Sequence, residues 1–260
     1  MNIIRFFILF LTVGLYGDNI DIVYHIATLN NWRDVAQEQL KTLESSGLWE
    51  ACDSLTVTVV GKQISEVKRL FERYKASEKL TIVHASKDLH QYEFPGIEMV
   101  QKIAREKPAS KILYIHTKGL LHHKQHTENN VRLWRKYMEY FTIERWTDCI
   151  EALVNADICG VDYSKSPSGY YFSGNFWWAR ASYIATCKLS RDSRYSCEQF
   201  VGTGTMPIAK SFHQSGENPK LLSLYPYASF PQYYHAAPGK EHFQNIMNLY
   251  LFGYLPEFYK

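Results

Sequence analysis

The chain has 260 residues, of which 46% are hydrophobic and 15% are aromatic. That length and apolar content are typical of one globular domain with a sizeable core. The net charge of +3 is nearly balanced, so nothing in it argues for bulk binding to nucleic acid. The 19 tyrosines and 6 tryptophans fit two uses, as core filling or as walls of sugar- and base-binding clefts, and composition does not separate them.

The first 17 residues form a segment of their own. Arg5 precedes an apolar run of about ten residues, and Gly17 then meets a polar start at Asp18. The run is shorter than the ~20 residues of a membrane-spanning helix. It predicts a signal peptide and hence the secretory pathway, with a secreted or membrane-associated product. A short uncleaved anchor is the alternative because Leu15 suits the cleavage site poorly, and the protein is cytoplasmic if the segment is not a working signal.

From residue 20 onward, strand and helix patterns alternate, and we expect one domain over residues 18–260. Apolar or β-branched runs predict strands, and apolar residues at helical spacing predict helices. The expected strands are 20–27, 55–60, 80–85, 112–115 and 157–161. The expected helices are 32–43, 64–74, 97–104 (begun after Pro95-Gly96), 131–141 and 146–154. This alternation predicts an α/β fold, a sandwich with a mostly parallel central sheet and right-handed crossovers.

Polar and cationic residues follow the strand 112–115 without a gap, in the sequence His116-Thr117-Lys118-Gly119. In open α/β sheets, ligands bind at the carboxyl ends of strands. We therefore expect an anion, in particular a nucleoside diphosphate, at the ends of the strands 20–27 and 112–115. The alternative is a loop that is basic but only solvated.

Several segments resemble glycosyltransferase-like proteins of bacteria and large DNA viruses, a group distantly similar to rhamnan-synthesis proteins. The segments are Tyr24-His25, Asn31-Trp32, Glu38-Gln39-Leu40, Ser46-Gly47-Leu48, Tyr92-Glu93-Phe94-Pro95, Tyr114-Ile115-His116-Thr117-Lys118-Gly119, Trp134-Arg135 and Phe172-Ser173-Gly174-Asn175-Phe176-Trp177-Trp178. The resemblance implies a GT-A type fold, with a nucleotide-binding αβα half followed by an irregular, aromatic-rich acceptor region. It also implies transfer of a sugar from a nucleotide-sugar donor to a glycan acceptor.

The donor site that this resemblance implies contains imidazole, hydroxyl and cationic groups. Its candidate donor- and phosphate-binding residues are His25, His116, Thr117, Lys118, Gly119, Arg132 and Arg135. Lys118 and the two arginines can make charge-assisted contacts to phosphate oxygens. We expect replacement of Lys118 or Arg135 to weaken nucleotide binding and to change folding little, because a charged side chain in a polar cleft does not hold the core together.

The aromatic motif supplies the candidate acceptor-binding residues, which are Ser173, Gly174, Asn175, Trp177 and Trp178. Glycine lets the backbone approach a sugar, asparagine bonds hydroxyls, and a tryptophan ring stacks on a pyranose face. The alternative is a core strand with buried tryptophans. Strand alternation predicts that one of Trp177 and Trp178 is buried and the other free.

An inverting glycosyl transfer needs a base that takes the proton of the acceptor hydroxyl. Two carboxylates are candidates for this catalytic role, Asp162 just past the strand 157–161 and Glu198 after the aromatic motif. Glu198 is slightly preferred because a glutamate follows the aromatic motif in the resembling proteins.

No Asp-x-Asp sequence, the metal-binding motif of most GT-A enzymes, occurs in the chain. No metal ligand is therefore assigned and no cofactor is expected with certainty, since fixed cations can replace Mn²⁺ or Mg²⁺ at a diphosphate. A site with His116 as one ligand stays open. The histidines at 122, 123 and 126 match no closed zinc pattern and predict a solvated loop.

Three hypotheses for function follow. The first is a glycosyltransferase whose partners are a nucleotide sugar and a glycan acceptor. The second is a non-catalytic carbohydrate-binding protein of the same fold, which the missing Asp-x-Asp makes credible. The third, a secreted zinc hydrolase, depends on the histidine loop alone. The 5 cysteines permit a disulfide bridge without requiring one.

Overall fold

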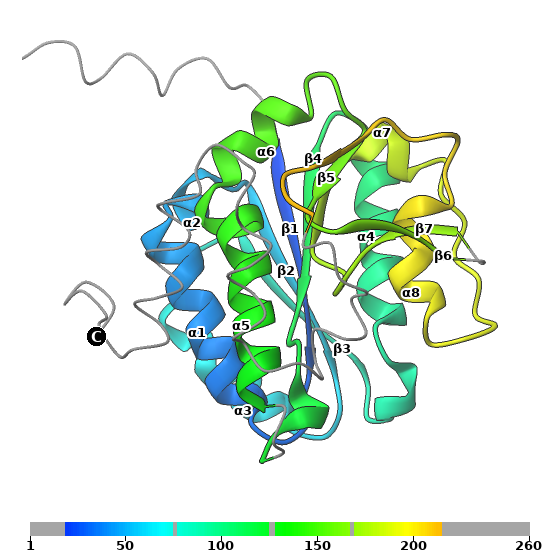
Figure 1. Ribbon diagram of the computed structural model, residues 1–260. Helices are drawn as coiled ribbons and strands as arrows, with labels where there is room; N and C mark the ends of the chain where they lie inside the picture. The colour runs from blue at the N-terminus through cyan, green and yellow to red at the C-terminus, as the bar shows by residue number, and fades with distance from the viewer. Residues whose placement is uncertain (1–18, 75–76, 125–127, 167–168, 215–260) are drawn as a thin grey trace, which may run out of the picture.

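The computed structural model describes residues 19–74, 77–124, 128–166 and 169–214, and these form a three-layered α/β structure (Figure 1). Its central sheet has seven strands in the order β3-β2-β1-β4-β8-β5-β9. The strands of this sheet are β1 (Ile20–Ala27), β2 (Ser54–Val60), β3 (Leu80–Ser86), β4 (Lys111–His116), β5 (Ile158–Gly160), β8 (Trp177–Arg180) and β9 (Ala209–Ser211).

Helices connect these strands. They are α1 (Trp32–Ser45), α2 (Leu48–Ala51), α3 (Ile64–Leu70), α4 (Phe94–Glu106), α5 (Glu128–Glu139), α6 (Trp146–Ala152), α7 (Ala181–Ile184) and α8 (Ser196–Gln199). A π-helical segment, η4 (Tyr140–Glu144), joins α5 to α6. Short 3₁₀ turns lie at η1 (Glu72–Tyr74), η2 (Leu89–Gln91), η3 (Leu120–His122) and η5 (Phe200–Gly202), and β6 (Tyr163–Ser166) and β7 (Gly169–Phe172) form a separate hairpin.

The sheet is mostly parallel. The strands β1 to β4 all pair in parallel, as does β5 with β9, whereas β8 runs antiparallel to both of its neighbours. Parallel neighbours need crossover connections, and the helices between the strands provide them. The predicted fold class, an αβα sandwich with a mostly parallel sheet, is confirmed.

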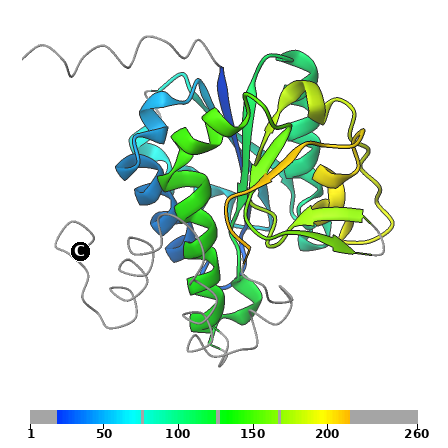
Figure 2. The same cartoon turned by 45° about the horizontal axis from the view of Figure 1, so that its top comes forward.

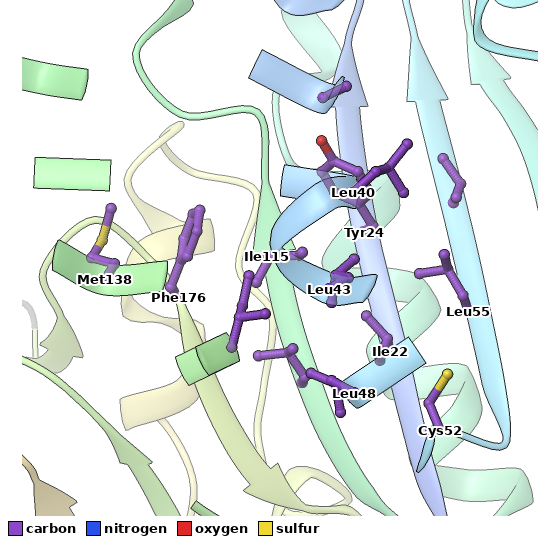
Figure 3. Close-up of a cluster of buried hydrophobic side chains, with 14 of the residues drawn as sticks. Ile22, Tyr24, Leu40, Leu43, Leu48, Cys52, Leu55, Ile115, Met138 and Phe176 are labelled. Carbon is purple, nitrogen blue, oxygen red and sulfur yellow. The ribbon is translucent and has the colours of Figure 1, made fainter. Parts of the chain in front are cut away.

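Helices cover both faces of the sheet. In Figures 1 and 2, α1, α2, α3, α5 and α6 lie on one side, and α4, α7 and α8 lie on the other. Alternation along β1 sends Ile22 and Tyr24 toward α1, where Leu40 and Leu43 pack on them (Figure 3). Val23 belongs to the second cluster, under α4. The sheet is therefore buried on both faces, as parallel sheets usually are.

The start of α4 differs from the sequence-based expectation. Helix α4 begins at Phe94, so Pro95 and Gly96 lie in its first turn rather than before it. Proline is tolerated there because the first amide groups of a helix have no partner within the helix. Gly96 has a packing role, since a Cβ atom at this position would lie 3.0 Å from His25 Cβ and from the Tyr114 ring.

The predicted signal peptide or anchor at residues 1–17 lies outside the described residues, as does the chain beyond residue 214. Among the residues that the structure describes, no helix has the length and apolar character to cross a membrane. All five cysteines are buried free thiols.

Candidate functional site

The site lies where β1 and β4 end side by side. His25 and His116 are register partners, and the backbone N–H of Thr117 continues the pairing by donating to the His25 carbonyl at 3.0 Å. The Thr117 hydroxyl accepts from the Ala27 N–H at 3.2 Å. The chain proceeds from β1 to β2 on one side and returns to β4 on the other. This reversal is the topological switch point at which open α/β sheets bind ligands.

Both histidines at this point are buried. His25 Nδ1 lies 3.0 Å from the Thr58 hydroxyl, and His116 Nε2 lies 3.0 Å from the Gly174 carbonyl oxygen, so this nitrogen donates. Burial lowers the pKa of His25 to about 4. Burial, with the charge of Lys118 adding to it, lowers the pKa of His116 to about 3. Both rings are therefore neutral near pH 7 and can offer hydrogen bonds, but not positive charge, to a ligand.

A carboxylate that was not among the predicted site residues stands beside His116. Glu93, directly before α4, accepts hydrogen bonds at Oε2 from the Tyr114 hydroxyl (3.0 Å) and from Asn175 Nδ2 (2.7 Å). The same oxygen lies 3.7 Å from His116 Nε2, and the side chain is 26% exposed. Two donors thus fix a carboxylate that still reaches solvent. The sequence signal was its place in Tyr92-Glu93-Phe94-Pro95, a segment that carries the resemblance.

The structure brings Lys118 and Glu198 together from positions far apart in the chain. Lys118 Nζ lies 3.9 Å from Glu198 Oε1 and 4.4 Å from the centroid of the Trp134 ring. The side chains of Lys118 and Glu198 are 19% and 28% exposed. A lysine with room to meet an anion and a carboxylate able to take a proton are therefore neighbours. Sequence reasoning assigned those two roles to these two residues.

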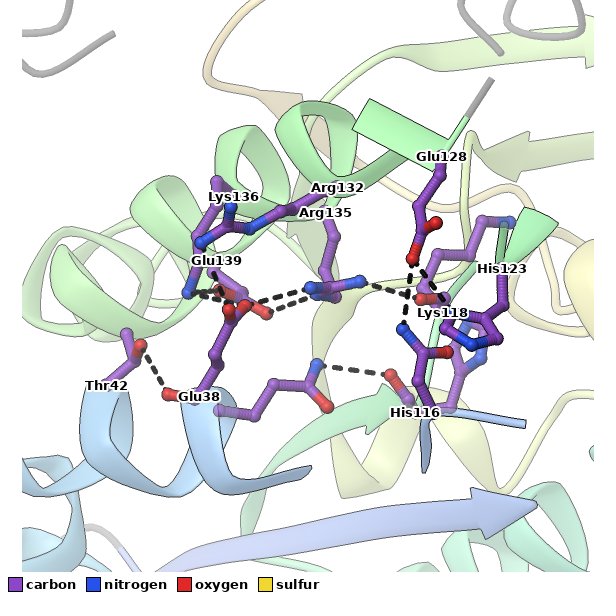
Figure 4. Close-up of polar contacts among 12 residues, drawn as sticks. Glu38, Thr42, His116, Lys118, His123, Glu128, Arg132, Arg135, Lys136 and Glu139 are labelled. Carbon is purple, nitrogen blue, oxygen red and sulfur yellow. Dashed lines mark hydrogen bonds and ion pairs between the residues drawn. The ribbon is translucent and has the colours of Figure 1, made fainter. Parts of the chain in front are cut away.

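Arg135 lies in a different setting from the one expected. Its guanidinium is 6% exposed and donates from Nη1 to the Lys118 carbonyl oxygen (3.0 Å) and from Nη2 to Glu38 Oε2 (2.9 Å). Its Nε lies 3.5 Å from Glu139 Oε1 (Figure 4). The expectation that Arg135 does not hold the core together is wrong, because this side chain is buried between α1, α5 and the loop after β4, where it also lines a polar cavity.

Arg132 and Gly119 line a cavity of about 250 Å³ between α1 and α5. Arg132 Nη2 contacts Glu38 Oε1 at 3.1 Å, but its side chain is 52% exposed. The charged side chains that line the cavity are Asp34, Glu38, Glu128, Arg132 and Arg135. With three carboxylates and two guanidinium groups, its walls suit a neutral hydrogen-bonding group better than a bare phosphate.

The predicted acceptor tryptophans are both in the core, with no exposed surface. The Trp177 ring stacks on Tyr114 at 5.3 Å, and Trp178 Nε1 donates to the Thr142 carbonyl oxygen at 2.7 Å on the opposite face. The expectation that one of the two is free is wrong. Alternation does send them to opposite faces, but helices cover both faces of β8.

The polar part of the aromatic motif is also committed to internal contacts. Asn175 is fully buried, and its Oδ1 accepts from Trp177 Nε1 at 2.7 Å. Ser173 is 1% exposed. Gly174 has φ +86°, and a Cβ atom there would lie 2.4 Å from Met138 Sδ. The motif therefore positions Glu93 through Asn175 and His116 through the Gly174 carbonyl oxygen, and it does not present its own side chains to a sugar.

Of the two predicted catalytic carboxylates, Asp162 is the buried one, with 2% exposure and a φ of +51°. Its carbonyl oxygen accepts from the Ser173 N–H (3.2 Å) and from the Ser164 hydroxyl (3.1 Å). Asp162 thus lies in a tight turn at the end of β5 without access to solvent. Glu198 is open to solvent and adjoins Lys118, which favours Glu198 for proton transfer.

Within the described part of the chain, no group of three or more His, Cys, Asp or Glu side chains is arranged to hold a metal ion. In the histidine loop, His123 Nδ1 lies 3.0 Å from Glu128 Oε1. His126 lies outside the described residues.

The model of one protein family, described as a domain of unknown function (DUF8361), matches residues 22–201. The chain belongs to this family. The match includes most of β1, the strands β2 to β8, the His-Thr-Lys-Gly loop and the aromatic motif, and it ends just after Glu198. A search of curated proteins finds no match.

Two solved structures are similar at low identity. One is 4-diphosphocytidyl-2C-methyl-D-erythritol synthase from Anaerococcus prevotii, with 13% identity, a TM-score of 0.42, and coverage of 78% of this chain and 91% of that chain. The other is HddC from Yersinia pseudotuberculosis, with 11% identity, a TM-score of 0.43, and coverage of 75% and 90%. At this distance neither similarity carries an activity over to the DUF8361 chain.

Proposed function

We propose that the protein is a glycosyltransferase that moves a sugar from a nucleotide-sugar donor to a glycan acceptor. The observation that carries the proposal is the pairing of Lys118 with Glu198 at the carboxyl end of β4, with Glu93 beside His116 at the same end of that strand. A switch point of an α/β sheet is a place for a nucleotide. A cation and two solvent-accessible carboxylates at that place supply the groups that glycosyl transfer needs.

Lys118 is the group proposed to meet the diphosphate. Of the seven predicted donor-site residues, it combines a positive charge with a partly exposed position at the end of β4. The two histidines are buried and neutral, and Arg135 is held by Glu38 and Glu139. As the bond to the sugar breaks, a fixed ammonium group stabilises the negative charge that develops on the leaving phosphate.

The cavity between α1 and α5 is the proposed place for the nucleoside part of the donor. It borders Gly119, one residue from Lys118, so a nucleoside there could direct its phosphates toward the lysine. The carboxylates of Asp34 and Glu128 in its wall are acceptors for ribose hydroxyls. Arg132 at the exposed side of the cavity can add a phosphate contact.

Glu198 is the proposed general base. An inverting transfer requires that the acceptor hydroxyl lose its proton as its oxygen attacks the anomeric carbon. In an inverting transfer the base and the leaving phosphate lie on opposite sides of the anomeric carbon, so the 3.9 Å ion pair of Glu198 with Lys118 has to separate when the sugar enters between the two side chains. Asp162 lacks solvent access and is the weaker candidate.

The second candidate is a non-catalytic carbohydrate-binding protein of the same fold. The absence of Asp-x-Asp from the chain favours it, since that motif normally holds the catalytic metal. Donor turnover separates the two candidates, because a binding protein would keep its affinity for a sugar without releasing a nucleoside diphosphate.

The proposal is tested by thermal-shift titration of the full chain with the common nucleoside diphosphates, followed by turnover assays with the corresponding nucleotide sugars. At least one diphosphate should raise Tm, and Lys118→Ala should weaken its binding by about 1.5–3 kcal/mol, the scale of a charged hydrogen bond. Glu198→Gln should keep nucleotide affinity and lose turnover. If the folded protein responds to none of the diphosphates, the proposal fails.

A further inference from the structure

Two exposed tyrosines accompany the two carboxylates of the site. Tyr92 is 40% exposed and immediately precedes Glu93. Tyr195 is 46% exposed and directly precedes α8, whose first turn contains Glu198. Single exposed aromatic rings are common on protein surfaces and do not by themselves indicate a binding site. Here each ring belongs to a segment that also contributes one of the two partly exposed carboxylates of the site, Glu93 beside His116 and Glu198 beside Lys118.

These two segments lie against each other. The Arg191 guanidinium lies 4.8 Å from the centre of the Phe94 ring, and the buried thiol of Cys197 interacts with the backbone of Glu93. The Arg194 guanidinium lies 4.7 Å from the Tyr195 ring. Because Tyr92 directly precedes Glu93 and Tyr195 lies two residues before Cys197, these contacts bring both tyrosines to the same region of the surface.

The backbone at Tyr92 is strained. Its φ of +46° and ψ of −131° are rare for a bulky residue, and such conformations cost on the order of 1–3 kcal/mol. Burial of the ring does not compensate for this cost, because the ring is half in solvent. Strained residues that persist on a surface are concentrated at ligand-binding sites. The strain therefore makes Tyr92 a candidate for contact with a ligand.

We propose that Tyr92 and Tyr195 form the stacking surface for a pyranose ring, whose hydroxyl groups bond to the carboxylates of Glu93 and Glu198. Tyrosine rings offer apolar faces to the C–H groups of a sugar, and carboxylates accept hydrogen bonds from its hydroxyls. This assignment replaces the buried Trp177 and Trp178. Only the identity of this pyranose as the acceptor of the transfer rests on the proposed function.

The test uses the full chain and a panel of methyl pyranosides, with binding measured by saturation-transfer NMR and by calorimetry. At least one pyranoside should bind. Tyr92→Ala and Tyr195→Ala should each weaken its binding roughly five- to tenfold, whereas Tyr92→Phe and Tyr195→Phe should keep the stacking and most of the affinity. Tyr170→Ala is the matched control, because Tyr170 is 41% exposed but stacks on Tyr163 at 5.6 Å. It should bind like the wild type.

The inference is overturned if the folded protein binds no pyranoside, or if the two alanine variants bind as well as Tyr170→Ala. Nucleoside diphosphate titration of the same variants separates this outcome from failure of the proposed function. Tyrosine-dependent sugar binding without any nucleotide response would remove the glycosyltransferase proposal and leave the pyranose site. If the protein and its variants at Tyr92 and Tyr195 all respond to a nucleotide but bind no pyranoside, the pyranose site is ruled out and the glycosyltransferase proposal remains.

Discussion

The Arg135 side chain donates a 3.0 Å hydrogen bond to the carbonyl oxygen of Lys118, so an arginine expected to bind phosphate instead holds the loop that carries the lysine. A second tie comes from Gln39, whose Nε2 donates to the His116 carbonyl oxygen at 3.2 Å. Both hydrogen bonds come from helices on the same face of the sheet, Gln39 from α1 and Arg135 from α5. They fix the backbone on either side of Thr117, which in turn limits the positions that the Lys118 ammonium can take.

Arg135 and Arg132 form a matched pair, because both contact Glu38 but only Arg135 is buried. Arg135→Ala should lower the free energy of unfolding by about 1.5–3 kcal/mol, since it removes buried charge-assisted hydrogen bonds to Glu38 and to the Lys118 carbonyl oxygen, while Lys136 still pairs with the carboxylates. Arg132→Ala should lower it by only about 0–1 kcal/mol, as for an exposed ion pair. Urea unfolding of the two variants at neutral pH measures the difference. Equal losses of stability in both would contradict the buried role of Arg135.

Gly119 and Gly47 provide a second matched pair, since both have positive φ, +95° and +75°. A Cβ atom at Gly119 would lie 2.5 Å from Val131 Cγ1, whereas one at Gly47 would meet nothing within 4 Å. Gly47→Ala should cost about 1 kcal/mol of backbone strain. Gly119→Ala adds a steric clash and should cost about 2–4 kcal/mol. A Gly119→Ala variant as stable as Gly47→Ala in urea would show that the loop moves aside freely.

Much of the fold was predictable because the spacing of apolar residues along the chain shows which faces of the helices and strands are buried. The predicted strand 20–27 coincides with β1, and the predicted helix 32–43 lies inside α1, because runs of apolar residues and helical spacing follow from which faces meet the core. Helix α4 was placed too late because Pro95-Gly96 has the composition of a turn. Only the close packing of Gly96 on His25 explains why the helix includes it.

The site was less predictable, because tertiary contacts decide which of its residues are buried and which remain exposed to solvent. Sequence reasoning treated Lys118 and Arg135 alike, and only the packing of α5 on α1 separates the partly exposed one from the buried one. It likewise treated Trp177 as a possible sugar platform, since alternation cannot tell how many faces of a sheet are covered. Glu93 was missed although it lies in a segment that carries the resemblance, because one glutamate before a helix has no spacing that marks it as a site residue.

The buried histidines predict a pH dependence of stability. The folded-state pKa values of about 4 for His25 and about 3 for His116 lie below the ordinary value near 6.5, so the unfolded chain binds more protons between these values. Stability should therefore be unaffected by these groups above pH 6.5. It should fall as the pH drops below 6.5, by at most about 1.4 kcal/mol per pH unit for each ring.

Urea unfolding between pH 4 and pH 8 measures this dependence, with His116→Gln as the comparison. Glutamine can still donate to the Gly174 carbonyl oxygen but does not titrate, so this variant should lose less stability on acidification than the wild type. NMR of the imidazole signals provides a direct check, because neither ring should titrate between pH 5 and pH 8. A titration of His116 near pH 6.5 would contradict its neutral state.

The ammonium group of Lys118 predicts that nucleotide binding does not depend on a metal ion. A diphosphate leaving group needs compensating positive charge, and either a divalent ion or a fixed ammonium group can supply it. His116 Nε2 donates to the Gly174 carbonyl oxygen, so this nitrogen is not a lone-pair donor to a metal in the present arrangement. We therefore expect nucleotide binding in the thermal-shift assay to survive EDTA, and Lys118→Ala to weaken it by the same amount whether or not Mn²⁺ is added. Loss of binding in EDTA, with recovery on addition of Mn²⁺, would assign the charge to a metal and leave Lys118 a secondary role. The Lys118→Ala variant decides between the two sources of charge, because a metal-dependent site would retain nucleotide binding in Mn²⁺ after the lysine is removed.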